Sequence, residues 1–152
     1  MLEIVLSVAV ADVSRTVDFY RHVLGFDLLG ATGKGGMTRA RVRHGAVELL
    51  FRTARSEGMA EVVRKLDPED RLVLYLKVDD IAALYQRVKG RVAIVRDLET
   101  TLFGMGEFAI EDLDGIVLWF SQAYSQPPAA KTLGASVSSM RGRDDHGAAD
   151  EA

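Results

Sequence analysis

The stretch that decides the fold spans residues 107–122 and reads EFAIEDLDGIVLWFSQ. Two apolar runs, at residues 108–110 and 116–120, flank a turn made of Asp112, Leu113, Asp114 and Gly115. An Asp-Gly pair between β-rich runs is a strong hairpin signal, because glycine adopts the positive φ of such turns without strain. The stretch therefore predicts a β-hairpin from which the rest of the fold can be built outward.

Length and composition bound the class of protein. The chain has 152 residues, of which 48% are hydrophobic and 27% charged, as in one folded domain with a substantial core. A net charge of −3 argues against nucleic-acid binding, and the absence of cysteine excludes disulfides, thiolate metal sites and cysteine nucleophiles. No run approaches the roughly 18 apolar residues of a membrane span, and the apolar N-terminus lacks the basic segment of a signal peptide. We therefore expect a cytoplasmic protein with neither a membrane nor a nucleic acid as partner.

Hydrophobic periodicity predicts the elements that precede the hairpin. A helical stripe begins after a capping residue at Asp12 or Ser14 and runs through Val13, Val17, Tyr20, Val23 and Leu24. Further helices are predicted at residues 55–66 and 81–88, strands at residues 3–10, 26–29, 37–43, 46–52, 72–78 and 92–95, and a loop at residues 96–101. Residues 125–152 lack any periodic pattern, which predicts a disordered tail after a domain at residues 1–124.

The domain contains an internal repeat. A shift of 68 residues places the run from Val5 to Val13 on the run from Val73 to Ile81, and each half continues as helix, glycine, strand, loop and hairpin. Sequence identity between the halves is low, so the repeat is recognised from the order of its elements and from the alignment of its apolar positions. The pattern predicts an α+β protein made of two βαβββ modules, at about residues 1–66 and 71–124.

Three motifs carry a resemblance to a known family. They are VADVSRTVDFY at residues 10–20 followed by LGF at residues 24–26, VDDI at residues 78–81, and DLDG at residues 112–115. Together they resemble the glyoxalase, bleomycin-resistance and extradiol-dioxygenase superfamily, the vicinal oxygen chelate fold, over residues 3–122. The last motif normally reads Asp-Pro-Asp-Gly, and Leu113 replaces the proline. The resemblance implies a curved mixed β-sheet cup with helices packed outside, and it is less specific for activity because one fold hosts several functions.

The resemblance also implies where a metal would bind. Metalloenzymes of this family hold a divalent ion in the cup, with ligands at positions that correspond here to Val5, Leu49, Val73 and Trp119. All four residues are apolar. Glu48 is the nearest candidate ligand, but strand alternation turns it away if Leu49 faces the cup, whereas a shift of one residue would turn it inward. We therefore expect no metal or other cofactor, and we assign no catalytic residue.

Without metal ligands, the cup becomes a candidate ligand-binding pocket. The residues expected to line it are Val5, Ser7, Arg39, Arg41, Leu49, Phe51, Val73, Tyr75, Phe103, Met105 and Trp119. Trp119 is either core packing or an aromatic wall on which a planar ligand stacks. The alternating arginines at residues 39, 41 and 43 are either a solvated face or, if they line the cup, a surface for an anionic or carbonyl-rich ligand.

The sequence favours a metal-independent binding protein. Its expected ligand is a planar or aromatic drug or metabolite, sequestered in the manner of bleomycin-resistance proteins, which confer antibiotic resistance. The resemblance further implies a homodimer whose cups combine modules of two chains. Two alternatives stay open: a divalent-metal-dependent glyoxalase-like lyase or dioxygenase-like enzyme, and a structural or regulatory protein whose pocket is vestigial.

Overall fold

The structure is a computed structural model that describes residues 1–124, so the predicted tail at residues 125–152 lies outside the described residues. The first module comprises β1 (Leu6–Val10), α1 (Val13–His22), β2 (Asp27–Thr32), β3 (Arg39–His44) and β4 (Val47–Thr53). The second comprises β5 (Val73–Lys77), α3 (Ile81–Val88), β6 (Ala93–Thr100), β7 (Met105–Glu111) and β8 (Val117–Ala123). A short helix α2 (Met59–Arg64) and the 3-10 turn η1 (Pro68–Asp70) connect them. The predicted α+β class and the two βαβββ modules are confirmed.

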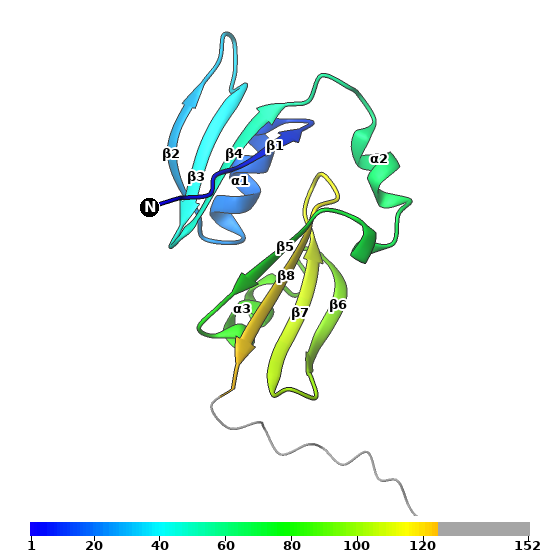
Figure 1. The fold of residues 1–152 in the computed structure, drawn as a ribbon. Helices are drawn as coiled ribbons and strands as arrows, with labels where there is room; N and C mark the ends of the chain where they lie inside the picture. The colour runs from blue at the N-terminus through cyan, green and yellow to red at the C-terminus, as the bar shows by residue number, and fades with distance from the viewer. Residues whose placement is uncertain (125–152) are drawn as a thin grey trace, which may run out of the picture.

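Each module folds into one four-stranded mixed sheet (Figure 1). The strand orders are β1-β4-β3-β2 and β5-β8-β7-β6, with β1 parallel to β4, β5 parallel to β8 and antiparallel pairing elsewhere. Helix α1 packs on the first sheet and α3 on the second, both behind the sheets in Figure 1. The opposite faces of the two sheets therefore point to the same side of the chain. No helix within residues 1–124 is long and apolar enough to cross a membrane.

The repeat extends to the helix caps. The Asp12 carboxylate accepts a hydrogen bond from the backbone N–H of Arg15 at 3.0 Å, and the Asp80 carboxylate accepts one from Ala83 at 3.0 Å. Asp12, rather than Ser14, is therefore the N-cap of α1. These side chains satisfy backbone N–H groups that have no partner within the helix.

Several predicted boundaries differ from the structure, two of them by four residues or more. The loop predicted at residues 96–101 is mostly strand, because β6 continues to Thr100 by pairing with β7 at Glu99–Glu107 and Thr100–Gly106. The helix predicted at residues 55–66 is limited to α2, none of whose residues is buried. Pairing with a neighbouring strand stabilises residues whose own pattern is not strand-like.

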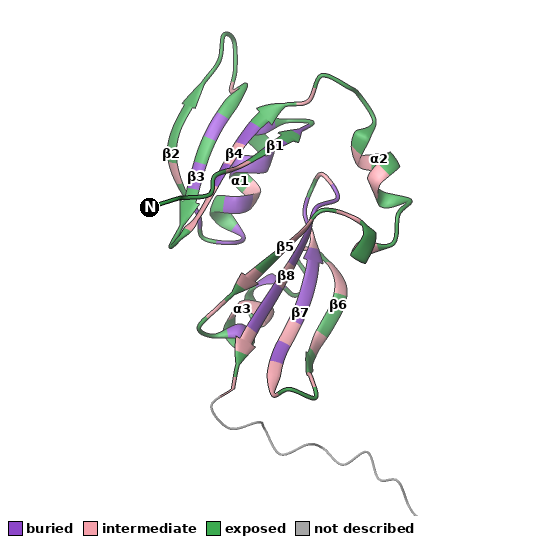
Figure 2. Ribbon diagram, in the orientation of Figure 1, coloured by how far each residue is buried: buried purple, intermediate pink, exposed green. Residues whose placement is uncertain are grey.

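Both modules contain buried residues (Figure 2). Their apolar side chains belong to one continuous core. Its centre in the first module is Tyr20, whose ring lies 5.3 Å from that of Phe26 and 4.9 Å from that of Phe51. In the second module the rings of Phe108 and Phe120 lie 5.0 Å apart. Large aromatic side chains contribute much of the buried apolar area of such a core.

The β7–β8 turn is organised by one buried carboxylate. Asp112 Oδ1 accepts hydrogen bonds from the backbone N–H groups of Asp114 and Ile116, at 2.9 and 3.0 Å. Asp112 Oδ2 accepts a hydrogen bond from the Tyr20 hydroxyl at 2.7 Å. The same side chain thus shapes a turn of the second module and holds α1 of the first.

A second carboxylate adds to this junction between the modules. Asp114 accepts hydrogen bonds from the backbone N–H of Ala11 at 2.8 Å and from the Thr16 hydroxyl at 3.1 Å. Both donors lie at the start of α1, more than ninety residues away in the sequence. The turn therefore contacts the first module through two adjacent side chains.

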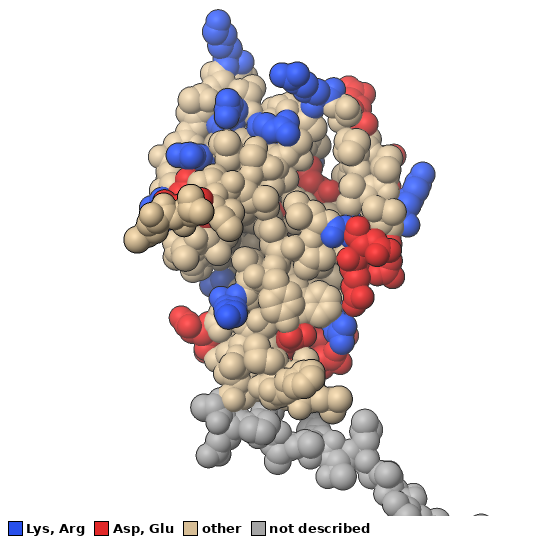
Figure 3. Space-filling view, in the orientation of Figure 1, with Lys and Arg blue, Asp and Glu red and all other residues tan. Residues whose placement is uncertain are grey.

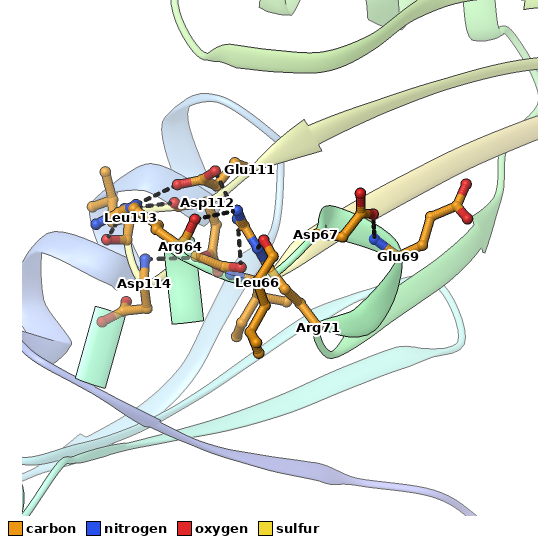
Figure 4. Close-up of polar contacts among 11 residues, drawn as sticks. Arg64, Leu66, Asp67, Glu69, Arg71, Glu111, Asp112, Leu113 and Asp114 are labelled. Atoms are coloured by element: carbon orange, nitrogen blue, oxygen red, sulfur yellow. Dashed lines mark hydrogen bonds and ion pairs between the residues drawn. The ribbon is translucent and has the colours of Figure 1, made fainter. Parts of the chain in front are cut away.

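The connecting segment is tied to the same turn (Figure 4). Arg64, at the end of α2, pairs with Glu111 and donates a hydrogen bond to the Leu113 carbonyl at 2.8 Å. Arg71 pairs with Glu111 at 2.9 Å, and its side chain is only 6% exposed. Glu111 is therefore already engaged by two guanidinium groups.

The buried carboxyl of Asp112 predicts a measurable pH dependence of stability. Burial raises the pKa of Asp112 from its ordinary value of 3.8 to about 6, although its hydrogen bonds oppose the shift. A carboxyl with a raised folded-state pKa stabilises the fold below its unfolded pKa, and this contribution is lost as pH rises through the folded value. Relative to Asp112→Asn, the wild-type free energy of unfolding should therefore fall by about 2–3 kcal/mol between pH 4 and pH 7. Denaturant titrations at several pH values measure it, and parallel profiles for the two proteins would contradict it.

Candidate functional site

The face of the first sheet away from α1 carries a group of charged side chains. On β3, Ala40 and Val42 are buried in the core, so the alternate residues point to the open face. On β4, Leu49 and Phe51 are buried in the same way. The open face consequently presents Arg39, Arg41, Arg43, Glu48, Leu50 and Arg52. In Figure 3, Lys and Arg side chains gather over this sheet, whereas the middle of the second sheet is mostly uncharged.

The prediction that Leu49 and Phe51 line the cup is wrong. These side chains are 2% and 0% exposed and pack in the core towards α1, so Glu48 and Leu50 lie on the open face instead. The error came from counting residues after the turn glycine. The β3–β4 turn occupies residues 45–46 and the β7–β8 turn residues 112–116, so the same count reaches opposite faces of the two sheets.

Glu48 is occupied by its neighbours on the first sheet. Its carboxylate lies 3.3 Å from Arg41 Nε and 2.6 Å from a terminal nitrogen of Arg43. The hydrogen bond from Arg43 lowers the pKa of the Glu48 carboxyl, and the charge of Arg41 acts in the same direction. At neutral pH Glu48 is therefore an ionised partner of two arginines.

A groove of about 820 Å³ runs along this open face. Its walls include Val5, Leu29, Arg39, Arg41 and Leu50, and all of its lining residues belong to the first module. Ser7 is exposed beside the groove, because β1 pairs with β4 at Ser7–Leu50. The groove thus combines an apolar floor with guanidinium groups along its side.

The open face of the second sheet carries an aromatic pair. The rings of Tyr75 and Trp119 are stacked, with centroids 6.0 Å apart and planes 16° from parallel. Glu107 accepts hydrogen bonds from both, from the Tyr75 hydroxyl and from Trp119 Nε1 at 3.2 Å. The guanidinium carbon of Arg96 lies 5.0 Å from the centroid of the Trp119 ring, as in a cation–π contact.

The exposed part of this aromatic pair has a shape that suits contact with a flat molecule. Tyr75 is 55% exposed, so part of its ring area is available to a ligand. Burial raises the pKa of the Tyr75 hydroxyl, and the hydrogen bond to Glu107 raises it further, which keeps the hydroxyl protonated. Two aromatic side chains fixed by one carboxylate lose little conformational freedom when a planar molecule stacks on them.

Two of the remaining predicted pocket residues share the face of the aromatic pair, and a third lies at the edge of the second sheet. Val73 precedes Tyr75 by two residues on β5 and shares its face, and Met105 precedes Glu107 in the same way on β7. Phe103 is 93% exposed at the β6–β7 turn. Ser121, on the open face of β8, is fully buried, and its hydroxyl has no hydrogen-bond partner within the described residues.

The predicted site residues therefore fall into two groups on different sheets. The aromatic group contains Val73, Tyr75, Met105 and Trp119, and the groove group contains Val5, Ser7, Arg39 and Arg41. The pocket residues predicted from the sequence did not include Leu50, Arg52, Arg96 or Glu107. The alternation of Glu48, Leu50 and Arg52 with the apolar residues of β4 was a signal that could have given the correct face.

The donor groups on these faces do not fit a metal centre. Within residues 1–124, no three His, Cys, Asp or Glu residues come together in a way that could hold a metal ion. Glu48 is paired with two arginines, and Glu107 is bonded to two aromatic side chains.

Residues 4–120 match the Glyoxalase/Bleomycin resistance protein/Dioxygenase superfamily. The match covers most of the chain, so this protein belongs to that superfamily. Among curated protein sequences none matches the chain.

Solved structures with the same fold include three proteins from Micromonospora and Streptomyces species. TioX from Micromonospora sp. ML1 has a TM-score of 0.67 at 21% identity, covering 82% of this chain and 100% of its own. The antibiotic-binding protein TnmS3 from Streptomyces sp. CB03234 has a TM-score of 0.60 at 24% identity, covering 82% and 97%. The bleomycin-binding protein of Streptomyces verticillus, solved with copper(II)-bleomycin, has a TM-score of 0.56 at 22% identity, covering 82% and 97%. At these identities the likeness establishes the fold.

The observed faces of β4 predict losses of stability of different size for two adjacent leucines. Leu49→Ala should lower the free energy of unfolding by about 2–5 kcal/mol, because it leaves a cavity in the core. Leu50→Ala removes the same atoms from the open face and should cost about 1 kcal/mol or less. Chemical denaturation of the two variants measures the difference. Equal losses, or a larger loss for Leu50→Ala, would contradict the assigned faces.

Proposed function

We propose that the protein binds a planar or aromatic small molecule on the open faces of its sheets and holds it unchanged, without a metal ion. The observation that carries this proposal is the stacked pair of Tyr75 and Trp119, which Glu107 holds on an uncovered face. The hydrogen bonds to Glu107 fix the orientation of both rings. Such a pair is suited to contact a flat ring system, because aromatic surfaces prefer offset stacking. The antibiotic-binding proteins that share its fold support the same interpretation.

The proposed biological consequence is sequestration of a drug or metabolite, as in antibiotic resistance. A protein that protects by binding acts stoichiometrically, so tight binding and slow dissociation matter more than turnover. Glu107 is already bonded to Tyr75 and Trp119, and the nearby Ser121 is fully buried, so neither side chain is placed to react with a molecule bound on this face. The function that the geometry supports is therefore binding.

We further propose that the binding cup is completed by a second copy of the chain. The two open faces lie side by side on the same side of one chain, and the groove on the first sheet has no wall from the second (Figures 1 and 3). A second copy that places its second sheet over the first sheet of its partner would enclose both faces at once. A two-fold symmetric dimer of this kind contains two equivalent cups.

Binding of a flat ligand should depend on the aromatic pair. Trp119 is the only tryptophan, so its fluorescence reports directly on this face. We expect a planar antibiotic at about 100 times its Kd to raise the melting temperature by roughly 5–10 °C. Tyr75→Leu, which keeps the fluorophore, should weaken binding by about tenfold or more.

The matched control for this experiment is Leu113→Ala, which removes an exposed apolar side chain outside both open faces. It should bind the ligand as the wild type does. If a panel of planar antibiotics neither quenches Trp119 nor shifts the melting temperature, the proposed function is wrong. If Tyr75→Leu binds as tightly as the control, the ligand lies elsewhere.

A shared cup predicts complementation between two damaged chains. Leu50→Glu damages the first-sheet face and Trp119→Leu the second-sheet face, so each variant alone should bind poorly. In a dimer with shared cups, a mixed dimer carries both substitutions in one cup and none in the other. Refolding the two variants together should therefore restore about a quarter of the wild-type sites, measured by calorimetry. No recovery, or a monomeric mass in sedimentation, would show that the cup is not shared.

A further inference from the structure

The first-sheet face holds more positive charge than its carboxylates neutralise. Arg39 and Arg52 lie directly opposite each other on neighbouring antiparallel strands. Within residues 1–124 neither takes part in an ion pair, since Glu48 is paired with Arg41 and Arg43. Like charges at directly opposed positions of an antiparallel pair destabilise the sheet. This pair is therefore a place where an added anion would be favourable.

The two glutamates of the second sheet that correspond to arginines of the first sheet are already bonded within their own chain. The positions on β7 that correspond to Arg39 and Arg43 of β3 are Glu107 and Glu111, because Leu50 and Trp119 occupy corresponding positions on β4 and β8. Glu107 is bonded to Tyr75 and Trp119, and Glu111 to Arg64 and Arg71. A partner subunit that covers the first sheet with its second sheet would bring carboxylates that are already satisfied.

We propose that the bound molecule is an acidic aromatic compound, whose anionic group is held by Arg39 and Arg52 while its ring system contacts the aromatic pair. This inference rests on the proposed function and specifies the chemical class of its ligand. Guanidinium groups match a carboxylate well, because their planar fork can donate two parallel hydrogen bonds. Leu50 and Val5 supply apolar surface in the same groove as Arg39, where part of the ring system would pack.

The test compares three probes with one ring system and different charges. They are anthraquinone-2-carboxylate, the neutral anthraquinone-2-carboxamide, and 2-(aminomethyl)anthraquinone, which is cationic at neutral pH. We expect the carboxylate to bind roughly tenfold tighter than the carboxamide, as charge-assisted hydrogen bonds do, and the cation to bind most weakly. The preference should shrink at high salt, because the arginines are exposed.

Variants assign the preference to particular side chains. In Arg39→Gln/Arg52→Gln the carboxylate should bind only as tightly as the carboxamide, whose own affinity should not change. The control Arg21→Gln/Arg87→Gln removes the same charge from exposed positions on α1 and α3, and it should keep the preference. Titrations of Trp119 fluorescence, with sedimentation of each variant, provide the measurements.

The possible outcomes separate this inference from the proposed function. Equal binding of the three probes would overturn the inference and leave the proposed function standing. Loss of the preference in both double variants would overturn the assignment to Arg39 and Arg52. A preference that survives in Arg39→Gln/Arg52→Gln, together with a weaker dimer, would make the two arginines a contact between subunits. Binding of none of the probes or of a wider set of planar antibiotics would overturn both.

Discussion

The hydrogen bonds of the Asp112 carboxylate connect local and global structure in this protein. Two of them go to backbone N–H groups within the β7–β8 turn, and the third comes from Tyr20 in the core of the other module. Burial of a charged group is unfavourable unless its hydrogen bonds are satisfied, and here three donors satisfy it. Because the adjacent Asp114 binds the start of α1, the turn joins the two modules at a fixed orientation. That orientation places α1 and α3 on one side of the chain and the open faces of both sheets on the other.

The fold follows from the sequence because its signals are local or repeated. Asp12 and Asp80 cap helices 68 residues apart, and the Asp-Gly turn marks the last hairpin, so element order could be predicted. The faces of β4 could not be predicted in this way. In its run of Val, Glu, Leu, Leu and Phe, two adjacent leucines satisfy either phase, and only packing against α1 decides between them. The same count reaches the open face at Trp119, because β8 enters its sheet in the opposite phase after the longer β7–β8 turn.

The side-chain contacts of the candidate site on the second sheet could be predicted only in part, because they too depend on how the strands pack. The aromatic pair is visible in the sequence as two residues on predicted strands, but the carboxylate that joins them lies on a third strand, β7. Arg96 reaches Trp119 from β6, where a break in the pairing register precedes it. Such contacts depend on the lateral order of strands. A sequence that specifies each strand does not state which side chains become neighbours across the sheet.

The two modules have the same strand order, but two corresponding positions carry side chains of opposite charge. Where β3 has Arg39 and Arg43, β7 has Glu107 and Glu111. Two copies of the first sheet placed face to face would bring arginines together, so in the proposed dimer electrostatics favours the first sheet facing the second. In that arrangement the glutamates would already be bonded, so the cup of the proposed dimer would hold a surplus of positive charge. A ligand that neutralised this surplus would bind the assembled cup better than either separate face, so ligand binding and association of the proposed dimer would favour each other.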